Sequence, residues 1–553
     1  MIALYDRIVR VSPRRQLLAG TAALFVLRLA LSTLRTGPVL VADEVGYLTN
    51  ARALAGGVRG QMTGAPFYHG GYSLLLAPLL ALDHDPTTSY HLVLALNALL
   101  AAGVAPLVYF LLTRRFAVSS RVAVWPSLAA GAYPSVTIFS QVALSENLLV
   151  PLIVVWSICF GGLLQAPTDP RRTAWASSTS LCAVWLWAAH GRMIIAVALT
   201  IVALIASAVL EPRRMRAALV GLLVIACGLV AVHELDHFLV DRNWGGHAPS
   251  EINGPLSMLE SLGGLVAFLR NLVGQTWYLL VATLGVLVAS LSLGRPHVPR
   301  RRPSSSELVL ALLLLTGIGL LFESALSFRT VDRPDTLVYG RYTEVVVPPL
   351  LALALARIDL RRYAALPTAV LLALATGATA LIRASFHPPG GANRWNIASL
   401  PAPARDLAPE VLVAAGAVAV LAVVVLATVR RRAPAAVVPL VLVLFLPTTA
   451  AYERNPVLFS EHDFYPAGWT SPAPVVGDAR TIAFDTQGGG ELWADQWFAS
   501  KAKFLLFSGS TQSPPAGLVI SSPAWAAAHA DLHPKPVWND PRSGTQLYRL
   551  RAG

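Results

Sequence analysis

The first 450 residues alternate long apolar runs with short polar segments. Each run holds about 20 residues, the length that a helix needs to cross the hydrocarbon core of a bilayer. Membrane β-barrels show shorter segments of alternating polarity, and this chain does not. The pattern predicts an α-helical polytopic membrane protein with about thirteen transmembrane helices, over residues 16–34, 90–113, 120–139, 143–164, 173–190, 193–210, 217–233, 271–293, 307–326, 343–357, 363–383, 409–429 and 434–450.

The composition agrees with an integral membrane protein. Hydrophobic residues make up 55% of the 553-residue chain and charged residues 13%, whereas soluble proteins carry about a quarter charged residues. The formal net charge of +13 comes largely from arginines at the ends of apolar runs. Such loops are typical of membrane proteins, so we exclude a nucleic-acid partner. The first run has no cleavage site, and we expect it to remain as an anchor.

The arginine clusters predict the orientation in the membrane. They precede the first run or fall in every second loop, and loops rich in Arg and Lys face the cytoplasm. We therefore expect a cytoplasmic N-terminus and an external C-terminus in the cytoplasmic (inner) membrane of a bacterium. The clusters are Arg14–Arg15, Arg114–Arg115, Arg171–Arg172, Arg213–Arg214 with Arg216, Arg300–Arg302, Arg361–Arg362 and Arg430–Arg432.

The opposite loops are rich in acids, His, Trp, Tyr and Gly. Residues 71–82 are apolar but too short to span, which predicts an interfacial helix. After residue 450 the composition changes, and short β-rich segments alternate with Gly, Pro and Ser. We predict a transmembrane domain over 1–450 and a small extracytoplasmic α/β domain over 451–553. Its strands are expected in "TIAFDT", "AKFLLFSG", "GLVISS" and "TQLYRL", and a helix in "SPAWAAAHADL".

Three acids stand at the predicted outer ends of spans. Asp43 and Glu44 follow the first run by about ten residues. Either they are solvated loop acids that cap a helix starting near Val45, or they belong to a site. Glu146 opens an apolar run, where a carboxylate is costly unless it has a partner or a role. Its simpler interpretation is a glutamate that snorkels or caps the helix.

Two arginines depart from the positive-inside trend. Arg192 follows His190 at the outer end of a run, and Arg341 lies in "YGRYTE". Each is expected to meet an anion on that face. The anion is either one of the outer acids or a substrate phosphate. For Arg341, an i, i+3 pair with Glu344 that orders the helix start is the simpler alternative.

Carboxylates and arginines on one face are the groups that a sugar or phosphate transfer site needs. A carboxylate takes the proton of an attacking hydroxyl, and arginines neutralise a phosphate leaving group. The chain has no P-loop and no GxGxxG after a strand, so no nucleotide site is expected. A lipid-linked substrate could instead reach the site sideways through the bilayer.

Three segments carry a family resemblance: "ADEVGYLTNARALAGG", "HGGYSLLLAPLL" and "YPSVTIFSQVALSENLLVPL". They resemble the membrane-embedded GT-C glycosyltransferases, closest to the branch of protein O-mannosyltransferases and lipid A aminoarabinose transferases. The motifs cover roughly the first 200 residues, and the remainder is similar in topology. The resemblance implies a GT-C-like catalytic domain. It also implies hexosyl or pentosyl transfer from a polyprenyl-phosphate sugar to a polysaccharide, lipid or protein of the cell envelope, on the outer face.

The resemblance and the topology together assign roles to nine residues. The resemblance implies a catalytic base, a second acid, and a neighbour that positions the acceptor or assists a metal: Asp43, Glu146 and Glu44. The topology assigns the donor phosphate to Arg192, Arg341 and His190. Three side chains in the outer-face motifs are candidates for binding the acceptor or the sugar: Tyr47, His69 and Tyr342.

The metal requirement stays open at this level. The family is divided on metal dependence, and this chain offers only acids, which could hold Mg²⁺, Mn²⁺ or Ca²⁺. "HELDH" at 233–237 formally meets the H-E-x-x-H pattern. It lies at a span end without a third ligand, so we do not expect zinc protease chemistry.

The alternative function is a transporter or flippase of a lipid-linked glycan. Transporters usually place ionisable groups near the midplane of broken helices and often contain inverted repeats. Here the ionisable groups gather at one edge of the membrane, and the loops on that edge are large. This distribution favours the enzyme.

Overall fold

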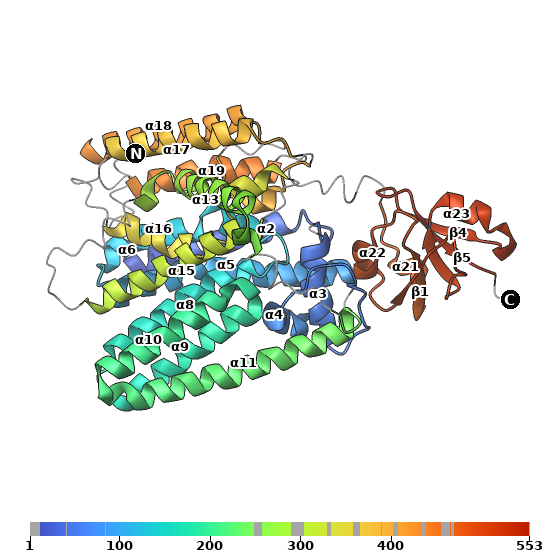
Figure 1. The fold of residues 1–553 in the computed structure, drawn as a ribbon, viewed down its shortest axis with the longest axis horizontal. Helices are drawn as coiled ribbons and strands as arrows, with labels where there is room; N and C mark the ends of the chain where they lie inside the picture. The colour runs from blue at the N-terminus through green and yellow to red at the C-terminus, as the bar shows by residue number, and fades with distance from the viewer. Residues whose placement is uncertain are drawn as a thin grey trace.

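The computed structural model describes residues 11–39, 41–82, 85–247, 257–288, 303–328, 333–357, 365–388, 390–401, 407–432, 437–454, 465 and 469–551. The chain forms a large bundle of apolar helices followed by a small α/β unit at one end of the bundle (Figure 1). Among the described residues, nine helices are long and apolar enough to cross a membrane. The chain is therefore a multi-pass membrane protein, as its hydrophobic pattern predicts.

At least one helix of the described chain overlaps each of the thirteen predicted runs, and the count of thirteen spans stays a prediction. The bundle helices are α2 (Pro13–Ser32), α5 (Pro86–Arg115), α6 (Ser120–Gly131), α7 (Pro134–Phe139), α8 (Glu146–Gln165), α9 (Asp169–Ala189), α10 (Ile194–Leu210), α11 (Met215–Asn243), α13 (Leu262–Ala282), α15 (Ser305–Ser327), α16 (Val347–Arg357), α17 (Ala365–Ala384), α18 (Pro409–Arg432) and α19 (Val437–Arg454).

Four predicted spans differ in detail. Helix α11 continues ten residues beyond the predicted end at 233, and α16 begins only at Val347, four residues after the predicted start. The other two are the third and the eighth. The third is two helices, because Pro134 lacks a backbone N–H and disfavours helical geometry at Tyr133 before it. The eighth begins nine residues earlier than predicted, at Leu262, and the described helix ends at Ala282. The second half of that predicted run falls partly on residues 289–293, which lie outside the described chain.

The loop after α2 holds two further helices. The predicted interfacial helix is α4 (Gly70–Leu80), and α3 (Val41–Leu54) precedes it. The start of α3 lies four residues before the predicted start near Val45, which places Asp43 and Glu44 in its first turn. We call the end of the bundle that carries α3 and α4 the site face.

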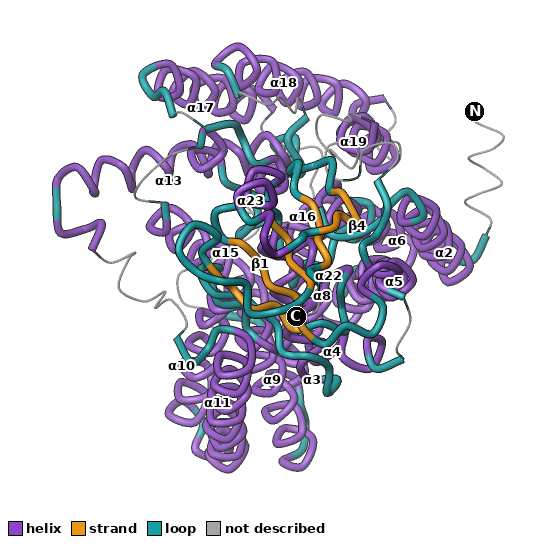
Figure 2. Tube along the Cα trace, turned by 90° about the vertical axis from the view of Figure 1, so that its right-hand side faces the viewer, coloured by secondary structure: helices purple, strands orange, loops and turns teal. Residues whose placement is uncertain are grey.

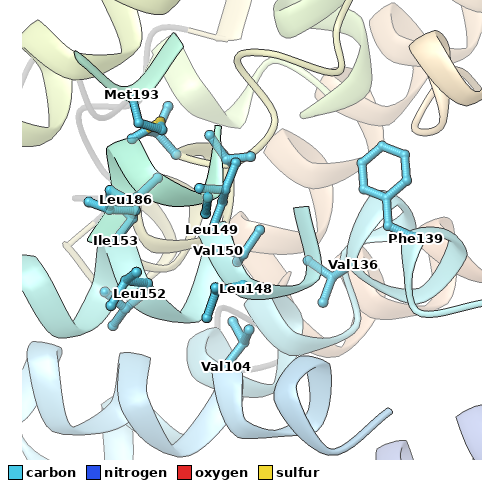
Figure 3. Packing of buried hydrophobic residues seen from close by; sticks show 14 of the residues in the cluster. Val104, Val136, Phe139, Leu148, Leu149, Val150, Leu152, Ile153, Leu186 and Met193 are labelled. Carbon is cyan, nitrogen blue, oxygen red and sulfur yellow. The ribbon is translucent and has the colours of Figure 1, made fainter. Parts of the chain in front are cut away.

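Helix α8 lies inside the bundle, packed against α5, α9 and α15. Helix α8 is the most enclosed of the nine candidate spans, with 89% of its apolar window buried. Leu148, Leu149, Leu152 and Ile153 of α8 pack among side chains of the neighbouring helices (Figure 3). Because α8 is held on all sides, the position of its first residue, Glu146, is fixed by the core.

The C-terminal α/β unit (residues 469–551) contains one five-stranded sheet, in the order β2-β1-β3-β5-β4. Strands β1 (Thr481–Asp485), β2 (Lys503–Phe507) and β3 (Leu518–Ser521) run parallel, whereas β5 (Gln546–Arg549) is antiparallel to β3 and to β4 (Lys535–Asn539). Helix α22 (Leu492–Phe498) follows β1, and α23 (Pro523–Ala528) follows β3. All four predicted strands and the predicted helix are present, and β4 is additional. The domain boundary at residue 450 stays a prediction.

The unit lies against the site face. Viewed from its side, the strands stand in front of the helical bundle (Figure 2). Helix α22 contacts α3 and α5, and Figure 1 shows it between the sheet and α3. The helix that carries Asp43 and Glu44 is thus enclosed between the bundle and the C-terminal unit.

Candidate functional site

Asp43 is partly accessible and doubly hydrogen-bonded. Its side chain is 29% exposed. Tyr68 Oη donates to its Oδ1 at 2.9 Å, and Arg341 Nη1 donates to its Oδ2 at 2.5 Å. The alternative of a solvated loop acid is wrong, because a buried guanidinium holds this carboxylate.

In the described part of the chain, Glu44 does not contact the arginine that binds Asp43, and it accepts hydrogen bonds from Tyr90 and two backbone N–H groups. It is fully buried. Tyr90 Oη and the backbone N–H of Ala143 donate to its Oε1 at 2.6 and 2.7 Å, and the N–H of Val39 donates to its Oε2 at 2.8 Å. These bonds connect the start of α3 to α5 and to the segment before α8. The contacts favour a structural role for Glu44.

Glu146 is the first residue of α8 and is buried. Its Oε1 accepts hydrogen bonds from Arg192 Nη2 at 2.9 Å and from Arg341 Nε at 2.7 Å. A carboxylate at this position is also favoured by the partial positive charge of the helix N-terminus. Glu146 therefore has the charged partners that its depth requires, which excludes a glutamate that snorkels to solvent.

Arg341 connects the two acids. It bonds to Asp43 through one terminal nitrogen and to Glu146 through Nε, although these carboxylates lie more than 100 residues apart in sequence. The backbone carbonyl of Asn396 accepts hydrogen bonds from the N–H groups of Gly340 and Arg341, at 2.7 and 3.1 Å. This pairing fixes the chain at Arg341.

The alternative pairing of Arg341 with Glu344 is not found among the described contacts. Glu344 instead accepts a hydrogen bond from Tyr278 Oη at 2.6 Å. Residues 341–346 form turns, and α16 begins only at Val347. The i, i+3 rule applies to helices, so its premise fails here.

Arg192 is buried with part of its guanidinium unpaired. It lies in the short 3₁₀ helix η1 (Gly191–Met193), after α9, and its backbone N–H donates to Nδ1 of His190 at 3.3 Å. The guanidinium carbon lies 4.5 Å from the centre of the Tyr342 ring. Within the described chain, its Nε and Nη1 atoms are buried and have no hydrogen-bond partner. Such donors are costly to bury without an acceptor.

The three candidates for acceptor or sugar binding occupy different places. Tyr342 lies beside Arg192 and His190, with its ring 5.7 Å from the His190 ring. Tyr47 is buried and donates to Ser145 Oγ, next to Glu146. His69 Nδ1 lies 2.7 Å from a carboxylate oxygen of Asp236 in α11. The structure thus brings Tyr342 and Tyr47 close to the acid–arginine cluster and connects His69 to α11.

Three residues that hold the acid–arginine cluster in place were not identified from the sequence: Tyr68, Tyr90 and Asn396. Tyr68 lies one residue before the quoted "HGGY" segment, and its phenol bonds to Asp43. Tyr90 bonds to Glu44, and Asn396 holds the backbone at Arg341. The polar residues of "GGANRWN" in an otherwise apolar half of the chain were the signal for Asn396.

A cation site among the outer acids stays a prediction. Within the described residues, no group of three or more His, Cys, Asp or Glu side chains is close enough to hold a metal ion. The guanidinium of Arg341 lies between Asp43 and Glu146, where a cation shared by these two acids would have to lie. In "HELDH", His233 and His237 are exposed, and Asp236 pairs with His69.

Comparisons with known proteins show the fold. No protein-family model matches the chain, and neither does any curated protein sequence. The chain is similar to the crystal structure of ArnT from Cupriavidus metallidurans bound to undecaprenyl phosphate, with a TM-score of 0.55 and 14% identity over 97% of this chain and 98% of that one. The apo structure of the same ArnT gives a TM-score of 0.52 and 15% identity, over 96% and 98%. These likenesses show that the chain has the overall fold of this ArnT, which agrees with the predicted helical membrane domain followed by a small C-terminal α/β unit.

Proposed function

We propose that this chain is a glycosyltransferase that moves a sugar from a polyprenyl-phosphate donor to a hydroxyl group of a cell-envelope acceptor, at the site face. The observation that carries the proposal is the cluster in which Arg341 joins Asp43 to Glu146 while Arg192 keeps two buried nitrogens unpaired. It lies at the membrane edge of a fold shared with a protein whose structure holds undecaprenyl phosphate.

The partners of each arginine suggest the donor's place. A phosphate can accept hydrogen bonds from the unpaired Nε and Nη1 of Arg192, and guanidinium groups bind phosphate in bidentate geometry. The same phosphate would compete with Asp43 for Arg341. His190 holds the backbone of Arg192, and Tyr342 stacks against its guanidinium, so both act through Arg192. Glu146 holds the two arginines together.

The proposed reaction uses Asp43 as the base. Once the donor phosphate binds Arg341, the Asp43 carboxylate is free to accept the proton of the acceptor hydroxyl. The acceptor oxygen then forms a bond to the anomeric carbon of the sugar. The bond from that carbon to the phosphate oxygen breaks, and polyprenyl phosphate leaves with the electron pair, stabilised by Arg192 and Arg341.

The finer specificity is also part of the proposal. The transferred sugar is a hexose or a pentose, and the acceptor is a polysaccharide, lipid or protein of the cell envelope. The lipid tail of the donor stays in the bilayer, and the site face points out of a bacterial inner membrane. A panel of polyprenyl-phosphate sugars, assayed with membranes that contain the chain, identifies the donor.

The test of the function is Asp43→Asn. The amide keeps the size of the side chain, and its oxygen can still accept the hydrogen bond of Arg341, but it cannot accept the proton. We therefore expect donor binding to persist and transfer to fall at least about 10²-fold. The assay is release of polyprenyl phosphate with purified protein in lipid nanodiscs. Asp169→Asn is the matched control, because Asp169 also pairs with an arginine, at 2.6 Å, but near the start of α9, away from the site face.

The outcomes separate the proposal from its alternative. Near-normal turnover in Asp43→Asn with a large loss in Glu146→Gln would mean that the base is misassigned. If neither change reduces transfer, the glycosyltransferase proposal fails, and movement of a lipid-linked glycan across the membrane becomes the function to assay. The fold shared with ArnT does not favour that alternative.

A further inference from the structure

We propose that α22 of the C-terminal α/β unit is a positioning element for α3, the helix that carries Asp43, and that Arg52, Gln496 and Trp497 perform this role. The inference rests on the proposed function for its consequence in catalysis. The contacts that support it lie near both ends of α3, on the side that α22 covers (Figure 1).

The C-terminal end of α3 is bound to the end of α22. Arg52, in the last turn of α3, donates to the backbone carbonyls of Gln496 and Trp497, both at 3.2 Å. Carbonyls at the end of a helix have no partner within it, so a guanidinium satisfies them well. The same guanidinium lies 4.9 Å from the centre of the Trp497 ring. One side chain of α3 thus makes three contacts with α22.

The segment after α3 is also bound to α22. The N–H of Gln61 donates to Oε1 of Gln496 at 2.9 Å, and Nε2 of Gln496 donates back to the carbonyl of Gln61 at 3.2 Å. Gln496 is 4% exposed. This reciprocal pairing satisfies a buried amide and holds the chain that leads from α3 to α4.

The segment before α3 is enclosed from the same side. Tyr465 Oη donates to the carbonyl of Pro38 at 2.7 Å. At Gly37, an added Cβ would lie 2.6 Å from Cζ of Phe498, the last residue of α22. A larger residue at position 37 would therefore push α22 away from the chain that enters α3.

A side-chain relay connects α22 to the acids themselves. The Trp497 ring makes an edge contact with the Tyr90 ring, at 6.3 Å between centres. The Tyr90 hydroxyl donates to Glu44 at 2.6 Å, and Glu44 is the neighbour of Asp43 in the first turn of α3. A shift of Trp497 would be transmitted to this turn. The C-terminal unit thereby sets the position of the base, while Arg192 and Arg341 are held by the bundle.

The test compares Arg52→Ala and Trp497→Ala with the unaltered full-length chain. Misplacing a catalytic group by about 1 Å can cost roughly 10²-fold in rate, so we expect kcat to fall by about that factor. The KM for the donor should change little, since the donor arginines do not lie on α3. Hydrogen exchange of peptides from 41–54 should rise in both variants. Arg52→Lys and Trp497→Phe should recover part of the rate.

Arg115→Ala is the matched control. Arg115 donates to the carbonyl of Ile158 at 3.0 Å, and its guanidinium lies 5.3 Å from the centre of the Trp175 ring, so it makes the same kinds of contact at the opposite end of the bundle. We expect its kcat and the exchange of α3 to stay normal. A normal kcat in both Arg52→Ala and Trp497→Ala overturns the proposal. Hydrogen exchange that rises equally throughout the chain also overturns it. If the unaltered chain transfers no sugar while exchange of α3 still rises selectively, the proposed function fails and the positioning role stands.

Discussion

At the scale of single residues, the site is organised by one guanidinium that two acids share. Arg341 is buried, and burying a lone charge costs several kcal/mol or more. Two carboxylates compensate that charge, and Arg192 adds a second cation beside Glu146. A site with two cations and two anions is near neutrality, so it can accept one anionic ligand only by releasing a carboxylate. Asp43, the more exposed acid, is the one that can be released.

The unpaired nitrogens of Arg192 give a prediction about donor affinity. Losing a charged hydrogen bond to phosphate costs about 1.5–3 kcal/mol, so Arg192→Ala should weaken donor binding roughly 10- to 100-fold. Arg192→Lys keeps the charge but not the bidentate fork, and should recover only part of the loss. Titration calorimetry of a polyprenyl-phosphate donor in detergent measures both. Unchanged affinity in Arg192→Ala would place the phosphate elsewhere.

The sequence singled out the charged residues that the structure brings together, but not how they pair. Positions at span ends identify Asp43, Glu146, Arg192 and Arg341, because a charge at membrane depth needs a reason. The bonds of Arg341 to Asp43 and Glu146 cross 298 and 195 residues, and local patterns carry no information about such distances. For the same reason the sequence could not show that Glu44 is bonded to Tyr90 and to backbone N–H groups, whereas Asp43 is bonded to Arg341.

At the scale of elements, the hydrophobic pattern predicted the bundle well because each span must be apolar over a fixed length. The additional strand β4 shows where such reasoning fails. Its sequence, "KPVWN", contains a proline and two polar residues, which argues against a central strand. β4 lies at the edge of the sheet, next to β5, and an edge strand tolerates these residues. Only the sheet order, a property of the fold, shows that.

The turn that carries Arg341 gives a prediction about an element boundary. A Cβ added to Gly340 would overlap the ring of Tyr278, whose hydroxyl is bonded to Glu344 and to the N–H of Ser399. Gly340→Ala should therefore displace Arg341 and reduce both donor affinity and transfer by about tenfold or more. Gly377→Ala is the control, because nothing lies within 4 Å of its added Cβ and alanine favours a helix. If Gly340→Ala and Gly377→Ala both keep near-normal activity, the turn at Arg341 accommodates the added Cβ and the prediction is wrong.

At the scale of the whole molecule, the C-terminal unit brings a buried charge cluster to the site face. Asp495 of α22 and Asp540 share the guanidinium of Arg542, at 2.7 Å each. Burial raises the pKa of Asp495 to about 7, and Asp540 and Glu491 also raise it, while Arg542 lowers it. One guanidinium neutralises only one of the two acids. The unit therefore holds Asp495 more readily in its protonated form than the unfolded chain does.

This cluster predicts how stability depends on pH. The folded pKa of Asp495 lies above its ordinary value of 3.8, so its contribution to stability is fully present below about 4 and is lost as the pH rises to about 7. We expect the β1 strand to be less protected at pH 8 than at pH 5, once its hydrogen exchange is corrected for the intrinsic exchange rate at each pH. Asp495→Asn should flatten that difference. Hydrogen exchange of the β1 peptide in the full-length chain, at both pH values, is the measurement. If protection of β1 depends more strongly on pH in Asp495→Asn than in the unaltered chain, the prediction is wrong.

The orientation of the whole molecule follows from the length of α11. Its 29 residues rise roughly 43 Å, more than the hydrocarbon core of about 30 Å, so its ends lie on opposite sides of a membrane. Asn243, at one end, bonds to Asn50 of α3 at 2.8 Å and so belongs to the site face. The arginines at 213, 214 and 216 lie at the other end. Arginine-rich loops are cytoplasmic, which predicts that the site face and α22 are outside.

Cysteine labelling of intact cells tests that orientation. With the native cysteines at 159, 182 and 227 replaced, Ser500→Cys, two residues after α22, should react with a membrane-impermeant maleimide. Arg213→Cys, at the opposite end of α11, should react only after the cells are permeabilised. The reverse pattern would turn the molecule over and put Asp43 in the cytoplasm. Because nucleotide sugars are available there, that result would also remove the reason for a lipid-linked donor, so topology and proposed chemistry are tested together.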